Sequence, residues 1–363
     1  MATLGINDLK QYAIPANWDA SYLRNLQLEA GENYEMLIND IAAALSVANS
    51  GLLSDPLYGS LVSSTPDATI EYRTGVTNGF EAHSEYTIPD GKRATTGGHM
   101  LPLLPYDRAM NWTWDFLRKA RRAQIEADIA SALDDLKNLY QQKILTRIFK
   151  NTYDDVGSGK TMPLADGGTA DSTYIPVPNP SRSSSAFLYT HNHVTYLNGI
   201  TQANLETAVT NLWEHGYDAP FDMLISTADI SSWSNTTNVT GWKDKAAAEI
   251  QYGSTTSLAR VDDSYIGAIT TTKGAIRVRA TGRIPTTYYC IYKSFGINDA
   301  RNPLVIRESP QFGLGAVLLA GDHIRQYPLE KAVLFTEFGV GVRERIGAVA
   351  YKSNTSYTIP TIS

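Results

Sequence analysis

The alternation of apolar and polar residues is most regular between Pro105 and Gly157, a stretch without internal proline or glycine. Its apolar residues recur in steps of three and four, which places them on one helical face: Ile125, Ile129, Leu133, Leu136, Tyr140, Ile144 and Ile148. The pattern predicts one amphipathic helix over residues 115–150, roughly 50 Å long at about 1.5 Å per residue. A helix of that length acts as a stiff rod, so we expect an elongated, flat molecule.

The residues before this helix predict an arm and a ribbon. Residues 1–65 read as an extended arm with one helix over 32–47, because Gly, Pro, Ser and Asn punctuate the rest. Residues 66–105 read as a hairpin-like ribbon with alternating runs at 69–73 and 85–88 and turn signals that include Gly97-Gly98. A two-stranded ribbon is marginal alone. We therefore expect the ribbon to dock on another surface.

The residues after the long helix predict an α+β body. A Gly-, Ser- and Pro-rich loop at 151–185 precedes a helix over 203–215. The tail over 332–351 looks strand-like, with Gly339 and Gly341 expected to interrupt it. The remaining strand-like segments are 221–226, 268–272, 275–280, 286–292 and 304–307.

Composition narrows the functional classes. The 363 residues are 43% hydrophobic, which fits a folded protein of about two domains. A net charge of -6 without a dominant basic patch argues against sequence-specific nucleic-acid binding. Cys290 is the single cysteine, so we expect neither an intramolecular disulfide nor a cysteine metal cluster, and we place Cys290 in a buried strand. We find neither a signal peptide nor an apolar run long enough to span a membrane.

Two short motifs suggest chemistry by their letters. Residues 157–161, Gly-Ser-Gly-Lys-Thr, resemble the end of a phosphate-binding loop, but Asp154 occupies the position that needs glycine, and no buried strand precedes the motif. His191 and His193 could bind a metal from a strand if further ligands lay nearby. The competing interpretation is that both imidazoles hydrogen-bond backbone at a strand edge.

The charged residues of the long helix do not form an active site either. Asp134 and Asp135 lie on its polar face with Glu126 and Asp128, where a solvated or intersubunit role explains them better than acid–base chemistry. The basic cluster at 118–122 could meet such acids on a neighbouring copy or touch nucleic acid. We predict no catalytic, cofactor-binding or metal-binding residue, no cofactor and no enzymatic activity.

The order arm, ribbon, long helix and body resembles the major capsid proteins of tailed bacteriophages, with the Hong Kong 97-like capsid fold. Residues 83–86, 89–90, 101–103 and 106–107 resemble that family's E-loop and its return to the long helix, called the spine helix. Residues 190–196, followed by His215-Gly216, resemble a motif of one branch. The closing third is similar through residues 302–308, 327–329, 338–345 and 347–349. The likeness covers most of the chain from about residue 70.

The resemblance implies a domain division and a function. It places the N-terminal arm at 1–65, the E-loop at 66–105, a peripheral domain at 106–200 and 325–363, and an axial domain at 201–324. It implies a shell protein that self-assembles into hexamers and pentamers of an icosahedral head around double-stranded DNA. The implied location is the virion capsid, assembled in the host cytoplasm.

The resemblance also implies partners and leaves one alternative of the same fold. Beyond other copies of the chain, the candidate partners are scaffolding, portal and decoration proteins and weakly, non-specifically bound DNA, with no membrane. The alternative is an encapsulin-like nanocompartment shell, in which the helix over 32–47 would help to bind a cargo peptide. Two other classes stay open: a metal-dependent nuclease using His191 and His193, and a tail or carbohydrate-binding protein, although neither repeats nor heptads are visible.

Overall fold

The computed structural model describes residues 34–74, 82–88, 91, 93, 95–113, 116, 119, 121–157, 159–167, 174–177, 182, 192–245, 265–320 and 329–362. These residues form two compact units. Unit 1 contains the described part of Met1–Leu52 together with Pro105–Leu139 and Leu314–Glu337. Unit 2 contains the described residues of Leu53–Leu104, Tyr140–Gly313 and Phe338–Ser363.

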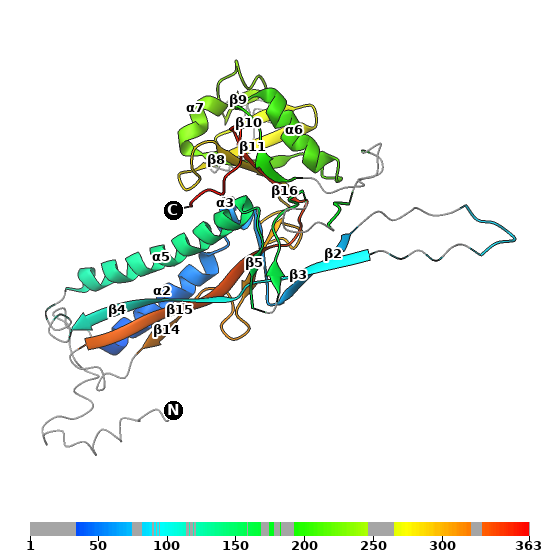
Figure 1. The fold of residues 1–363 in the computed structure, drawn as a ribbon. Coiled ribbons are helices and arrows are strands. Elements are labelled where there is room, and N and C mark those ends of the chain that lie inside the picture. The colour runs from blue at the N-terminus through cyan, green and yellow to red at the C-terminus, as the bar shows by residue number, and fades with distance from the viewer. Residues whose placement is uncertain are drawn as a thin grey trace, which may run out of the picture. The chain divides into compact units, whose positions relative to one another are not determined.

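The predicted long helix is confirmed over the described residues. Helix α5 runs from Arg122 to Phe149 without a break, 28 residues and about 42 Å (Figure 1). Six of the seven residues in the predicted apolar stripe are buried, and Leu133 is half-buried. Residues 114, 115, 117, 118 and 120, where the predicted start falls, lie outside the described residues. The predicted flat shape stays a prediction.

Polar side chains tie the elements of unit 1 together. Helix α2, Tyr34–Gly51, carries Asn49, whose amide donates to the Ala316 carbonyl at 2.8 Å and accepts from the Ala316 N–H at 2.9 Å. Ala316 begins β14, Ala316–Ala320, which pairs with β15, Leu329–Val342. Strand β4, Leu104–Thr113, also pairs with β15, and its Trp112 indole donates to Asp128 of α5 at 3.0 Å.

The largest sheet lies in unit 2 and has seven strands in the order β7-β16-β12-β8-β11-β10-β9. All six residues of β8 are buried, as expected for a central strand. Helix α6, Gln202–Trp213, packs its apolar face on this sheet (Figure 1). The strands are β7 (Val194–Tyr196), β8 (Phe221–Ser226), β9 (Trp242–Asp244), β10 (Gly267–Thr271), β11 (Gly274–Thr281), β12 (Tyr288–Tyr292) and β16 (Ala348–Lys352).

A segment inside the predicted arm forms a helix and a strand of unit 2. Helix α3, Pro56–Gly59, leads into β1, Val62–Thr65, which pairs in parallel with β13, Leu304–Glu308. Strand β13 pairs on its other side with β15. Leu61 and Val62 are fully buried, so this part of the chain contributes to a core that the sequence did not predict. The predicted division into four domains is not decided by these pairings and stays a prediction.

The ribbon has two strands, of which only the first lies where the sequence predicts it. Strand β2, Thr69–Thr74, pairs antiparallel with β3, Thr95–Met100 (Figure 1). The first matches the predicted run at 69–73. The second contains Gly97-Gly98, which we predicted as a turn; a Cβ on Gly98 would lie 2.9 Å from the Ile70 carbonyl oxygen, so glycine permits the close pairing. Residues 85–88 form no strand.

The prediction that Gly339 and Gly341 interrupt the tail is wrong. Both lie inside β15, which continues to Val342. A Cβ on Gly341 would lie 2.3 Å from the Leu101 side chain, and one on Gly339 2.3 Å from the Pro102 carbonyl oxygen. The two glycines therefore allow Leu101 and Pro102 to pack against the strand.

Candidate functional site

A cleft runs along β2 in unit 2; we call it the β2 cleft. It has a volume of about 710 Å³, and one wall is the seven consecutive residues 67–73. Side chains alternate along a strand, so an unbroken run of lining residues means that the cleft follows the strand edge. The other wall is formed by Tyr217, Phe295, Ala300, Arg301, Arg343 and Glu344.

The far wall of the β2 cleft combines an apolar surface with fixed charges. The Arg301 guanidinium lies over the Phe295 ring at 4.3 Å and binds both carboxylate oxygens of Asp299 at 2.9 and 2.8 Å. Arg343 donates to the Ser63 hydroxyl at 3.2 Å. Burial raises the pKa of Glu344, and burial, with the charge of Glu344, raises the pKa of Tyr217. The cleft therefore offers aromatic surface with oriented cations at its rim.

Segment 82–88, between the two ribbon strands, exposes large apolar side chains. Tyr86 is 89% exposed and Ile88 is 93% exposed. They are two positions apart, so in an extended chain they lie on one face, with Glu85 and Thr87 on the other. Side chains of this size gain about 1.5–3 kcal/mol each when they are buried. Burial of these two side chains against another surface would therefore be favourable.

A second groove lies between α2 and α5 in unit 1; we call it the α2–α5 groove. Its volume is about 320 Å³. Ile41, Ala44, Ile129, Ala130 and Leu133 make it apolar, and Asp40 and Glu126 make it acidic. A groove between two helices fits a helical partner better than an extended one.

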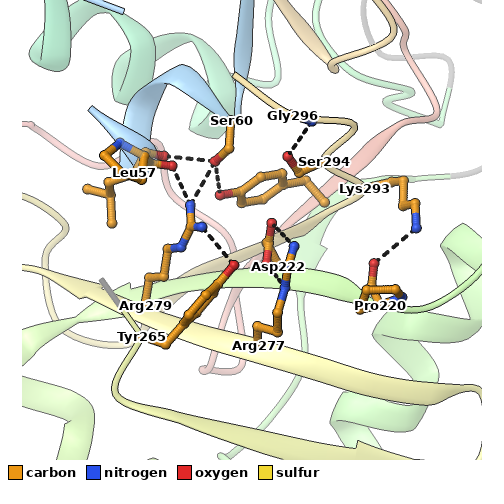
Figure 2. A network of polar contacts seen from close by, with 12 residues as sticks. Leu57, Ser60, Pro220, Asp222, Tyr265, Arg277, Arg279, Lys293, Ser294 and Gly296 are labelled. Carbon is orange, nitrogen blue, oxygen red and sulfur yellow. Dashed lines mark hydrogen bonds and ion pairs between the residues drawn. The ribbon is translucent and has the colours of Figure 1, made fainter. Parts of the chain in front are cut away.

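A buried polar network connects α3 to the large sheet. Arg279 of β11 is 4% exposed and donates to the Ser60 hydroxyl at 2.9 Å, the Tyr265 hydroxyl at 2.8 Å and the Pro56 carbonyl. Figure 2 shows this guanidinium between the α3 segment and the Tyr265 ring. The Ser60 hydroxyl also contacts the Tyr292 hydroxyl at 2.9 Å. Arg279 thus positions the segment that leads into β1.

Asp222 forms the acidic centre of the same region. The Asp222 side chain is fully buried in β8. The guanidinium of the partly exposed Arg277 donates to its two carboxylate oxygens at 2.7 and 2.9 Å (Figure 2). Burial raises the pKa of Asp222, although Arg277 and Arg279 pull it down. Lys293 donates to the carbonyls of Asp218 and Pro220, and its pKa is lowered by partial burial and by Arg277. The two bonds of Lys293 fix the backbone of residues 218 and 220.

The structure pairs His193 with His215. His191 lies outside the described residues. His193 is fully buried; its Nδ1 bonds the Ala348 carbonyl at 2.9 Å, and its Nε2 lies 3.2 Å from Nε2 of His215. Nδ1 of His215 bonds the Val177 carbonyl at 2.8 Å. Carbonyl oxygens only accept, so each Nδ1 is placed to donate to its carbonyl partner. For His193, the predicted bond to backbone at a strand is confirmed.

The phosphate-loop-like segment forms a hairpin. Strands β5, Asp154–Asp155, and β6, Lys160–Thr161, pair antiparallel, and the Val156 N–H donates to the Gly159 carbonyl at 2.9 Å. This geometry is unlike a phosphate loop, which opens a helix.

The described residues contain no group of three or more His, Cys, Asp or Glu side chains placed to hold a metal ion. Asp135 pairs with Arg108, and Asp134 is exposed, so the predicted polar face is present on α5. None of the helices in the described part of the chain has the length and hydropathy to cross a bilayer.

Comparison with known proteins finds a fold and no sequence family. No family model matches the chain, and no curated protein matches it. Among solved structures, a chain from Mycobacterium phage Patience aligns with a TM-score of 0.61 and 21% identity, covering 96% of this chain and 97% of that one. This establishes the shared fold and confirms the predicted α+β, Hong Kong 97-like class.

Two further solved structures are less similar. The capsid of a native GTA particle aligns with a TM-score of 0.47 and 13% identity, covering 82% of this chain and 91% of that one. The SrpI encapsulin of Synechococcus elongatus aligns with a TM-score of 0.44 and 12% identity, covering 84% and 90%. Both TM-scores lie below 0.5, a level that does not establish a common fold.

Proposed function

We propose that this chain is a major capsid protein that self-assembles into the hexamers and pentamers of an icosahedral phage head around double-stranded DNA. The observation that carries the proposal is the fold shared with the phage Patience chain over 96% of this chain. Segment 82–88 supports it, because its exposed Tyr86 and Ile88 fit a subunit that is completed by neighbours.

The proposed role needs contacts rather than catalysis. A subunit in a closed shell makes several moderate interfaces, and symmetry repeats each of them around a ring. A two-stranded ribbon is marginal alone, so a neighbouring copy would supply further contacts to it. We propose no enzymatic activity for the chain. The proposal includes the four-part division into arm, E-loop, peripheral domain and axial domain, and a location in the virion capsid.

Further partners follow from the same proposal. Scaffolding, portal and decoration proteins are candidates, and the net charge of -6 would let packaged DNA contact the inner wall weakly. The encapsulin-like alternative is favoured by one observation, the apolar α2–α5 groove, which has the size to hold part of a peptide.

Purified wild-type protein tests the proposal by electron microscopy and nucleic-acid analysis. We expect closed icosahedral particles when the chain is expressed with its phage partners, and protected double-stranded DNA in particles from infected cells. Particles that contain a cargo protein and lack nucleic acid would decide for the alternative. A chain that stays monomeric with all candidate partners present would refute both.

A further inference from the structure

We propose that His193 and His215 together bind one proton more than two neutral imidazoles carry, shared between their Nε2 atoms. We call the pair the His193–His215 clasp, because its bonds link the segment at Val177 and the end of α6 to β16. The inference goes beyond the proposed shell function and does not depend on it, since every contact lies within unit 2 of one chain.

The backbone holds both rings in place. The His193 N–H donates to the Ala165 carbonyl at 2.6 Å, and the His193 carbonyl accepts from the Ala350 N–H at 2.7 Å. The His215 N–H donates to the Leu212 carbonyl at 3.2 Å, directly after the last residue of α6 and its cap. The ring centroids lie 5.1 Å apart, and His193 is fully buried. The two rings are thus held close together at a site that is closed to water on the His193 side.

The hydrogen-bond partners fix the number of protons that the clasp needs. Nδ1 of His193 lies 2.9 Å from the Ala348 carbonyl oxygen, and Nδ1 of His215 lies 2.8 Å from the Val177 carbonyl oxygen. A carbonyl oxygen only accepts, so each Nδ1 needs a proton. Two neutral rings then have no proton left for the Nε2 atoms, whose lone pairs would repel each other across 3.2 Å. A third proton converts this contact into an N–H···N hydrogen bond and gives the pair one positive charge.

The segments that hold the clasp carry one more carboxylate than cations among the described residues. Asp166 pairs with Arg345 at 3.8 Å, and Asp218 pairs with Arg182 at 2.7 Å. Arg182 also donates to the carbonyls of residues 213 and 217, on either side of His215. The full set is Asp166, Glu214, Asp218 and Glu344 against Arg182, Arg345 and Lys352. One positive charge on the clasp would balance it.

The buried titratable groups of these segments favour the same charge state. Burial raises the pKa of Glu214, the residue before His215, and of Glu344. A positive charge nearby reduces the cost of ionising a buried carboxyl. Burial also raises the pKa of Tyr217 and Tyr351, which therefore stay neutral and add no competing charge. The clasp is thus the group in this region that can supply the balancing cation.

A metal ion is the alternative occupant. Two imidazole nitrogens on a tetrahedral zinc ion, at about 2.0–2.1 Å from the metal, lie roughly 3.3–3.4 Å apart, close to the observed 3.2 Å. However, zinc takes at least three protein ligands in most sites. The described residues contain no group of three or more His, Cys, Asp or Glu side chains placed to hold a metal. The geometry therefore favours a proton, and a metal becomes one outcome of the test.

The clasp makes stability depend on pH on both sides of an optimum. In the unfolded chain each histidine titrates at about 6.5, so at that pH the two rings together bind one proton beyond their neutral forms. The native clasp also binds one. Above about pH 6.5 the native state holds more protons than the unfolded state, so stability falls as the pH rises. Below about pH 6.5 it holds fewer, so stability falls as the pH falls.

Nuclear magnetic resonance of the full unassembled subunit, with isotope-labelled histidine rings and a chelator present, counts the protons directly. His193→Gln and His215→Gln assign the signals of the clasp. His83→Gln, at an exposed residue, is the control and should leave those signals unchanged. Near neutral pH we expect protons on both Nδ1 atoms and one proton shared by the two Nε2 atoms, which is lost at alkaline pH.

A double-mutant cycle is the independent measurement. His193→Asn and His215→Asn each keep an amide that can donate in place of Nδ1, and each removes the Nε2 contact. The coupling energy comes from urea denaturation of the wild type, both single variants and the double variant. We expect it to be largest near pH 6.5 and lost at about pH 9. His99 is present in all four proteins, so its own titration cancels.

Three results would overturn the inference: two bare Nε2 atoms near neutral pH, an Nδ1 atom without its proton, or a coupling energy that does not change with pH, as a packing role alone would give. Displacement of the shared proton by one equivalent of added zinc, once the chelator is removed, would also overturn it and assign a metal site instead. None of these results bears on the shell function, which particle formation tests separately.

Discussion

Gly339 of β15 lies directly against the backbone of Pro102, so close that a Cβ on residue 339 would be 2.3 Å from the Pro102 carbonyl oxygen. The contact brings the residues after β3 onto the strand that also pairs with β13. Because the neighbouring atoms are backbone, they cannot rotate away as a side chain would. The position of Pro102 thus depends on the absence of one methyl group.

Gly339→Ala should lower the free energy of unfolding by about 1–3 kcal/mol, the usual cost of overpacking a filled site. Urea denaturation of the unassembled subunit measures the change. Gly91→Ala is the matched control, since no atom lies within 4 Å of the Cβ it would add. Equal stability of the two variants would show that the Pro102 backbone can shift at little cost.

Stability should fall in mild acid because of His99. Burial, with the positive charges of Arg345 and Arg147, lowers the pKa of His99 from 6.5 to about 4. The unfolded chain therefore takes up its proton first, and stability is lost as the pH falls from about 6.5 to about 4. The full effect of such a shift is on the order of 3 kcal/mol. His99→Leu should flatten the pH dependence of urea midpoints across this window; an unchanged slope would argue against the shift.

Arg279→Lys should destabilise the region around α3. A lysine cannot reproduce the three directed contacts to Pro56, Ser60 and Tyr265, and each lost bond to a charged donor is worth about 1.5–3 kcal/mol. We expect faster proteolysis near residues 53–61 and a lower unfolding midpoint. Arg301→Lys, at an exposed pair with Asp299, is the matched control and should change the midpoint little. Resistance to protease equal to that of the wild type would show that α3 is held by other contacts.

Cys290 should not react with thiol reagents in the native subunit. It is fully buried in β12, and burial raises its pKa to about 12, so almost no thiolate exists at pH 8. Labelling should become complete only in denaturant. Rapid modification without denaturant would mean that the central sheet opens under native conditions.

The sequence predicts best those helices and strands that have a regular local spacing of apolar residues. The long helix follows from its three- and four-residue spacing, and the buried run 221–226 matches β8 because a central strand is apolar on both faces. Gly97-Gly98, Gly339 and Gly341 misled us because glycine also occurs where another backbone approaches closely. That approach is a tertiary contact and leaves no local signal.

The histidine pair and the β2 cleft also depend on tertiary contacts that the sequence does not reveal. The pairing of His193 with His215 joins residues 22 positions apart, and neither spacing nor composition indicates it. The β2 cleft combines residues near positions 70, 217, 300 and 343, which only the fold brings together. Tyr86 and Ile88 could have been singled out from their alternation, but their exposure could not.

The amide of Asn302 donates to the Val62 carbonyl across a separation of 240 positions, next to the parallel pairing of β1 with β13. During synthesis β1 leaves the ribosome long before its partner exists. At about 5–20 residues per second, it waits on the order of ten seconds or more. A polypeptide that terminates before β13 therefore keeps an unmatched β1 edge and cannot complete this parallel pairing.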